Sequence, residues 1–221
     1  MNRKLLAVLC AVLVFAAAGP VSAEILTFSL AGQINEGEPI PDSEGDLKIG
    51  DDTILDITYR DVDDFGIAND VDCLRFQIPN YGDLETGVAY AGQFPGSSVG
   101  EIRFQGMTVG GQQYEAQLFS FDLAGFDGDD QHEIDIKVYD EDWNVLAYWD
   151  NQTISGTTRT SFAFDPVVSS SALVLQWSDP WDVAIDNVVY DAVAVPEPAT
   201  VIGWVIGLGC LGYVTYRRRG R

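Results

Sequence analysis

Short segments in which hydrophobic and polar residues alternate fill the chain from Ile25 to Asp191. In the stretch HEIDIKVY, Ile134, Ile136 and Val138 fall on one face, and polar residues fall on the other. A period of two is typical of a strand with one buried face. Such segments recur between Gly, Asp, Asn and Pro, and only the two ends of the chain depart from them. The pattern predicts roughly ten strands in an all-β antiparallel β-sandwich or jelly roll.

The first 23 residues have the pattern of a secretory signal peptide. A basic start, MNRK, precedes the apolar run LLAVLCAVLVFAAA, and the small residues of VSA offer a cleavage point before Glu24. The apolar run is short for a helix that stays in the membrane. We therefore expect residues 1–23 to be removed and the protein to be exported through the inner membrane.

The chain ends in VPEPATVIGWVIGLGCLGYVTYRRRGR. Its two prolines favour an extended stretch that cannot enter the interior of a sheet. No charge follows until the terminal arginines, so residues 199–216 are predicted to form one transmembrane helix, although they are few for a full span. The arginines would remain in the cytoplasm and the body would lie outside. The sequence thus predicts a single domain over 24–195, between the signal peptide 1–23 and a tail over 196–221.

This three-part tail resembles the PEP-CTERM sorting signal. The resemblance implies recognition by an exosortase, an integral-membrane cysteine transpeptidase, with cleavage near the PEP motif. It also implies a Gram-negative bacterium that makes extracellular polysaccharide, and a protein that is transiently anchored by its C-terminal helix before it reaches the cell surface. The alternative is a permanent membrane anchor. The residues of the sorting motif are Pro196, Glu197, Pro198, Arg217, Arg218 and Arg219.

The second half of the body, from FSFDLAGF through VAIDNVVYDAVAVPEPAT, is similar to the jelly-roll bodies that are often joined to this tail. The formal net charge of the chain is −22. A body this acidic repels phosphate backbones, so nucleic acid is not an expected partner. It attracts cations instead.

Two acidic loops are candidates for Ca²⁺ binding. In DVDDFGIANDVD, Asp61 and Asp63 stand at the first and third positions of a calcium loop, but Phe65 stands at the fifth position and cannot act as a ligand. We therefore do not expect an EF-hand, and the alternatives are a looser calcium site and a solvated acidic turn. In GFDGDDQHE, Asp127 and Asp129 are close enough to bind Ca²⁺ together, although they suit a turn equally well.

A third calcium candidate comes from resemblance alone. Related sandwich modules that bind carbohydrate often place a structural calcium ligand on an Asp near the final strand, which implies such a role for Asp186 in VAIDNVVY. The alternative is a hydrogen-bonding residue at a strand edge. Trp181, in the loop-like stretch SDPWD, and Trp149 are candidates for stacking on sugar rings. Core packing is the alternative for both.

No catalytic constellation stands out in the body. Glycoside hydrolysis needs only two carboxylates at the right separation, and nothing in the sequence selects a pair. We therefore expect a non-enzymatic protein of the cell surface or extracellular matrix, sorted by exosortase and associated with exopolysaccharide. The alternative is a surface protein that binds or hydrolyses glycans through its carboxylates.

Overall fold

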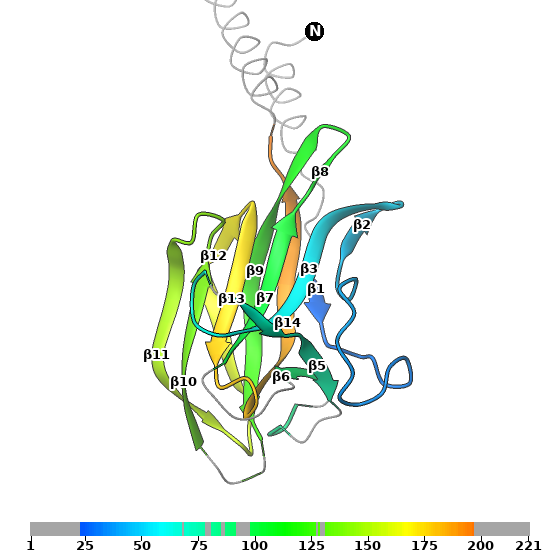
Figure 1. Ribbon diagram of the computed structural model, residues 1–221. Helices are drawn as coiled ribbons and strands as arrows, with labels where there is room; N and C mark the ends of the chain where they lie inside the picture. Colours follow the sequence, from blue (N-terminus) through cyan, green and yellow to red (C-terminus); the bar gives the residue numbers. More distant parts are fainter. Residues whose placement is uncertain are drawn as a thin grey trace, which may run out of the picture.

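The structure, a computed structural model, describes residues 23–67, 69–77, 81–84, 87–91, 98–126, 128 and 131–196. Within these residues the chain forms β-strands joined by turns and bends, and none of them is helical. The strands build two sheets, in which every pair of neighbouring strands is antiparallel. The sheets face each other across a common core (Figure 1). The predicted all-β antiparallel sandwich is therefore confirmed.

The first sheet has the order β12-β9-β14-β6-β5, with β1 added beside β14 and β8 beside β9. Its long central strands, β9 and β14, run antiparallel along most of their length. The members of this sheet are β1 (Glu24–Leu26), β5 (Leu74–Gln77), β6 (Val88–Ala91), β8 (Thr108–Val109), β9 (Gln112–Gly125), β12 (Thr160–Ser170) and β14 (Val183–Ala194).

The second sheet has the order β11-β10-β13-β7-β3-β2, with β4 added beside β3. The predicted alternation holds in β10, because Ile134, Ile136 and Val138 are buried while the residues between them are partly exposed. The members of this sheet are β2 (Leu47–Ile49), β3 (Asp52–Val62), β4 (Asp70–Asp72), β7 (Val99–Gly106), β10 (Gln131–Tyr139), β11 (Val145–Ser155) and β13 (Ala172–Ser178).

The inner faces of both sheets contribute to one large hydrophobic cluster. Aromatic rings link the sheets across it. Phe104 on β7 meets Tyr190 on β14 with ring centroids 5.5 Å apart, and Phe121 on β9 meets Trp149 on β11 at 6.0 Å. Burial of this apolar surface is the main force that holds the two sheets together.

The two poles of the sandwich carry different parts of the chain. At one pole Val62, Val99 and Ser178 lie side by side in register, at the end of β3, the start of β7 and the end of β13. The strand β14 begins at this pole and runs to the other, where its last residues pair with the start of β9 beside β8 (Figure 1). The described chain therefore ends, at Pro196, at the pole opposite Ser178.

Both predicted membrane-directed segments fall almost wholly outside the described residues. Of the signal peptide 1–23 the structure describes Ala23 alone, and of the tail 196–221 it describes the exposed Pro196. The predicted transmembrane helix over 199–216, together with Glu197, Pro198 and the terminal arginines, lies outside the described residues. The part of the chain that is described contains no helix with the length and apolar character needed to span a membrane.

Candidate functional site

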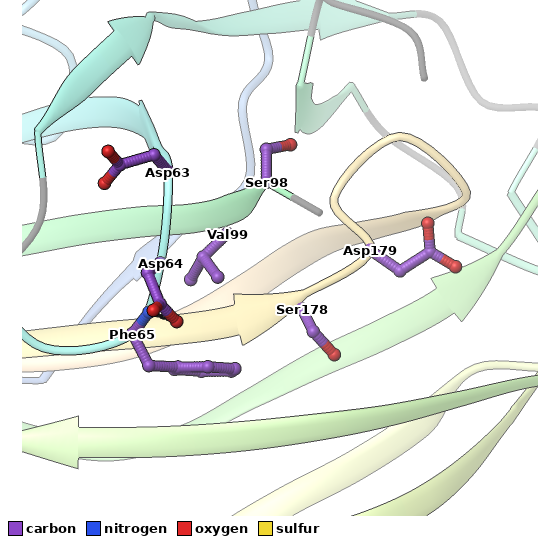
Figure 2. A pocket seen from close by; sticks show the side chains of 7 residues that line it. All are labelled: Asp63, Asp64, Phe65, Ser98, Val99, Ser178 and Asp179. Atoms are coloured by element: carbon purple, nitrogen blue, oxygen red, sulfur yellow. Dashed lines mark hydrogen bonds between the residues drawn. The ribbon is translucent and has the colours of Figure 1, made fainter. Parts of the chain in front are cut away.

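A groove of about 520 Å³ lies at the Ser178 pole of the second sheet. The lining side chains come from three segments that are far apart in sequence: the loop after β3, the start of β7 and the end of β13 (Figure 2). They are mainly carboxylates and hydroxyls, with one aromatic ring. The lining residues are Asp63, Asp64, Phe65, Ser98, Val99, Ser178 and Asp179.

The loop after β3 folds back over the outer face of its own sheet. The backbone N–H of Gly66 donates to the side-chain oxygen of Gln176 at 2.7 Å, and the side-chain nitrogen of Gln176 donates to the Gly66 carbonyl at 3.1 Å. Gly66 has a φ of +86°, which glycine adopts without strain. This pair of hydrogen bonds fixes the neighbouring Phe65. The centroid of its ring lies 4.3 Å from the Nζ atom of Lys137.

A buried polar network forms the floor under this loop. Glu101 and Gln176 are fully buried although they lie on the outer face of the sheet. The Nε atom of Arg60 donates to Glu101 at 2.8 Å, and a second guanidinium nitrogen contacts the same oxygen. Gln176 donates to the other oxygen of Glu101 at 2.6 Å. Because charge-assisted bonds satisfy both carboxylate oxygens, the network holds Gln176 in place, and Gln176 in turn holds the loop at Gly66.

The carboxylates of the groove lie in different electrostatic environments. Hydrogen bonds from Asn69 lower the pKa of Asp63. Burial raises the pKa of Asp179, the charge of Asp182 adds to this effect, and His132 opposes it. Figure 2 shows the Asp63 carboxylate turned away from the other side chains of the groove. Asp179 is thus the less solvated carboxyl.

A mixed cluster of possible metal ligands adjoins the groove at Asp179. One ligand atom each from His132, Asp179 and Asp182 lies within 4.8 Å of the others. The Nδ1 atom of His132 is 3.6 Å from the nearer oxygen of Asp179. One imidazole and two carboxylates form a donor set that suits a divalent metal ion.

The structure places Asp61 and Asp63 in different environments, although the sequence grouped them as calcium ligands. Asp61 is fully buried, and neither of its carboxylate oxygens has a hydrogen bond of ordinary geometry, although Ser98 is near enough to lower its pKa. Asp63 is exposed, and its two oxygens accept bonds from Asn69 at 2.9 and 3.0 Å. Calcium binding by either residue stays a prediction.

Replacing Asp61 with asparagine should raise the melting temperature at neutral pH. Burial raises the pKa of Asp61, Ser98 partly opposes this, and the charge of Asp72 adds to it. When a carboxyl has a higher pKa in the folded state than in the unfolded state, the folded protein becomes more stable as the pH falls through that pKa. Above that pKa the ionised carboxylate destabilises the fold. The advantage of Asp61→Asn should therefore be largest near pH 7 and shrink towards about pH 4 in thermal melts. An equal response of Asp52→Asn, at an exposed position of the same strand, would contradict this explanation.

The other predicted ligands are less informative. Asp127 and Asp129 lie outside the described residues. Asp186 is fully buried on β14, directly opposite Asp122 of β9. Because β14 lies inside the sheet, between β9 and β6, Asp186 is not at a sheet edge, and both its calcium role and the hydrogen-bonding alternative stay predictions.

Neither predicted tryptophan lines the groove. Trp149 packs edge-on against Phe121 and Phe162 in the interior, with ring centroids 6.0 and 5.4 Å apart. Trp181 is half-buried, its ring meets Tyr90 at 5.9 Å, and its carbonyl accepts a bond from the Tyr81 hydroxyl at 2.8 Å. These placements match the packing alternative, and glycan contact at either tryptophan stays a prediction.

Sequence reasoning missed the residues of the buried network under the loop and those of the mixed cluster. His132 is the single histidine of the chain and is not among the residues that were predicted to form a site. The stretch SDPWD had drawn notice for Trp181, whereas its two aspartates, Asp179 and Asp182, are the residues that face His132. The useful signal would have been the pairing of a lone histidine with an acidic turn.

The fold and the site together define an antiparallel β-sandwich domain with a polar groove at one pole. No family model matches the chain, and a search of curated proteins gives no match. Among solved structures, the chain is similar to the CBM22-1 xylan-binding domain of Paenibacillus barcinonensis Xyn10C, with 12% identity and a TM-score of 0.32 over 81% of this chain and 100% of that one.

Two further solved structures are similar over part of their length. The enzymatically active domain of tailspike protein 4 from bacteriophage CBA120 has 15% identity and a TM-score of 0.29 over 63% of this chain and 19% of that chain. Discoidin II from Dictyostelium discoideum has 9% identity and a TM-score of 0.30, over 64% and 55%. Each of these two matches covers less than two thirds of this chain and less than two thirds of the matched chain. At identities and TM-scores this low, the likenesses carry no argument about what this chain binds.

Proposed function

We propose that this chain is an exported, non-enzymatic surface protein whose β-sandwich binds an extracellular polysaccharide in the groove at the Ser178 pole. The observation that carries the proposal is the combination of one aromatic ring, Phe65, with hydroxyl and carboxylate groups in one groove, beside a loop that the buried network anchors. Sugars offer both chemistries that such a site recognises. Their C–H faces pack on aromatic rings. Their hydroxyls donate hydrogen bonds to carboxylates, and they both donate to and accept from serine hydroxyls.

The charge of the groove favours a neutral polysaccharide over an acidic one. Three carboxylates, those of Asp63, Asp64 and Asp179, line it, and they outnumber the neighbouring lysine, Lys137, whose Nζ atom lies over the Phe65 ring. Together with the net charge of −22, they would repel the carboxylates or sulfates of an acidic polymer. We therefore assign neutral glycans as the ligand class.

The direction in which the chain leaves the sandwich supports a surface role. The described chain ends at Pro196, at the pole opposite the groove (Figure 1). The tail that follows has the features of an exosortase sorting signal, by its PEP motif, apolar run and terminal arginines. A body that is held at the cell surface through this end would present the groove outwards, towards the matrix.

Replacing Phe65 with alanine should abolish retention of the full chain on the neutral polysaccharides that retain the wild type. Loss of the ring removes the apolar face against which a sugar packs, and we expect affinity to fall at least about tenfold, since a well-buried aromatic contact contributes more than 1 kcal/mol. Affinity electrophoresis across a panel of neutral and acidic polysaccharides measures this. Ile67→Ala is the matched control, because Ile67 is an apolar residue of the same loop, is 80% exposed and does not line the groove.

The same panel separates binding from hydrolysis, which is the second candidate because three carboxylates line one groove. Retention without release of reducing ends supports a binding module. Release of reducing ends by the wild type would overturn the non-enzymatic part of the proposal. Equal retention of Phe65→Ala and Ile67→Ala would overturn the assignment of the groove.

A further inference from the structure

We propose that His132, Asp179 and Asp182 form a binding site for a divalent transition-metal ion, with Zn²⁺ as the best match. The three side chains come from two segments, the start of β10 and the turn between β13 and β14. Their ligand atoms already lie within 4.8 Å of one another, a spacing that a single ion can bridge with small side-chain adjustments. This inference does not depend on the proposed glycan binding.

The histidine ring is oriented by packing. Its Cδ2 and Nε2 atoms lie against Gly125, the last residue of β9, and a Cβ at Gly125 would come within 2.6 Å of Cδ2 and 3.1 Å of Nε2. Glycine at this position therefore makes the space that the ring occupies. Nε2 is buried and has no hydrogen-bond partner. The packing leaves Nδ1 as the nitrogen that faces Asp179, at 3.6 Å.

Hydrogen bonds hold the backbone of the turn that carries the two carboxylates. The carbonyl of Asp179 accepts the backbone N–H groups of Asp182 at 3.2 Å and Val183 at 2.9 Å. The carbonyl of Asp182 accepts the N–H of Phe126 at 2.7 Å, which ties the turn to the end of β9. The histidine and the turn thus contact consecutive residues, Gly125 at the end of β9 and Phe126 directly after it. A turn held in this way needs little ordering of its backbone when an ion binds.

The donor set selects the class of metal. Ca²⁺ and Mg²⁺ prefer sites made of oxygen ligands, whereas imidazole together with carboxylates suits Zn²⁺ and related first-row ions. Asp179 and Asp182 repel each other in partly buried positions, and a dication would relieve that repulsion. Three protein ligands leave at least one coordination position for water or for a ligand, and Asp179 also lines the groove.

Titration of the untagged full chain in detergent with ZnCl₂ tests the site. We expect one Zn²⁺ per chain by calorimetry, and a larger rise in melting temperature than CaCl₂ or MgCl₂ gives at the same ionic strength. Because the chain has a single histidine, its imidazole NMR signals report on one residue and should shift as Zn²⁺ binds. A polyhistidine tag would compete for the metal and must be absent.

Two variants guard against loss of folding. His132→Gln and Asp182→Asn should each lower Zn²⁺ affinity by at least tenfold, while their melting temperatures without metal show whether they fold. Asp142→Asn, at an exposed position in the turn between β10 and β11, should bind as the wild type does, and so should Phe65→Ala, which separates this site from the glycan proposal.

Three results would overturn the inference. Equal stabilisation by Zn²⁺ and Ca²⁺ would reduce the effect to general cation binding by an acidic surface. Zn²⁺ binding without a shift of the imidazole signals would place the ion elsewhere. Unchanged affinity in a folded Asp182→Asn variant would remove that residue from the site.

Discussion

Replacing Trp177 with alanine should lower the free energy of unfolding by about 3–5 kcal/mol, the range for loss of a large aromatic side chain from a core. Trp177 is fully buried on the inner face of β13. Its indole N–H donates to the carbonyl of Val183 at 2.9 Å, so the variant also leaves a buried carbonyl without this partner. Chemical denaturation of residues 24–196, followed by far-UV circular dichroism, measures the change without relying on tryptophan fluorescence.

The Trp177→Ala substitution should leave a cavity, and the residue next to Trp177 explains why that cavity should stay open. The indole ring lies over Gly100 of β7, where a Cβ atom would come within 2.5 Å of the ring. Since Gly100 has no side chain, nothing from that position can fill the space, and the cost should lie in the upper part of the range. Leu146→Ala is the control, because Leu146 is 40% exposed on β11. A loss in Trp177→Ala no greater than in Leu146→Ala would contradict the role of this ring.

The strands were predictable because their information is local. In HEIDIKVY the two-residue period predicts which residues face the core. The structure buries Ile134, Ile136 and Val138, as this pattern requires. The same rule places Ala147 and Trp149 together on the inner face of β11. Trp149 therefore packs against the core, which is the alternative to its predicted stacking on sugar rings. The alternation thus predicts the sandwich and the inward side of strands such as β10, whereas β13 is buried along nearly its whole length.

The order of strands and the sites were not predictable, because they depend on pairings between distant segments. The groove exists because β3, β7 and β13 end or begin at the same level, which no local pattern states. Asp61 and Asp63 show the limit of spacing arguments. Asp61 lies within β3 and its carboxylate is buried, whereas Asp63 lies beyond the end of that strand, in the loop, and reaches solvent.

Replacing Glu101 with alanine should destabilise the domain by about 2–3 kcal/mol and loosen the loop over the groove, since hydrogen bonds to charged groups contribute about 1.5–3 kcal/mol. Glu101 is fully buried and holds both Arg60 and Gln176. Removal leaves the buried Gln176 amide without one acceptor. The cost stays below that of a fully buried ion pair, because the Arg60 side chain is 28% exposed and can be hydrated.

The loop should respond more than the rest of the domain. Gln176 is the residue that bonds both the N–H and the carbonyl of Gly66, so its loss of anchorage at Glu101 should reach Phe65 and the groove. Hydrogen exchange of the Gly66 amide, beside denaturant unfolding of residues 24–196, measures the two effects separately. Glu133→Ala is the matched control, because Glu133 is an exposed glutamate on β10 of the same sheet. If Glu101→Ala loses no more stability than Glu133→Ala and leaves Gly66 equally protected, the buried network does not position the loop, and the groove must owe its shape to the backbone of β3 and β7 alone.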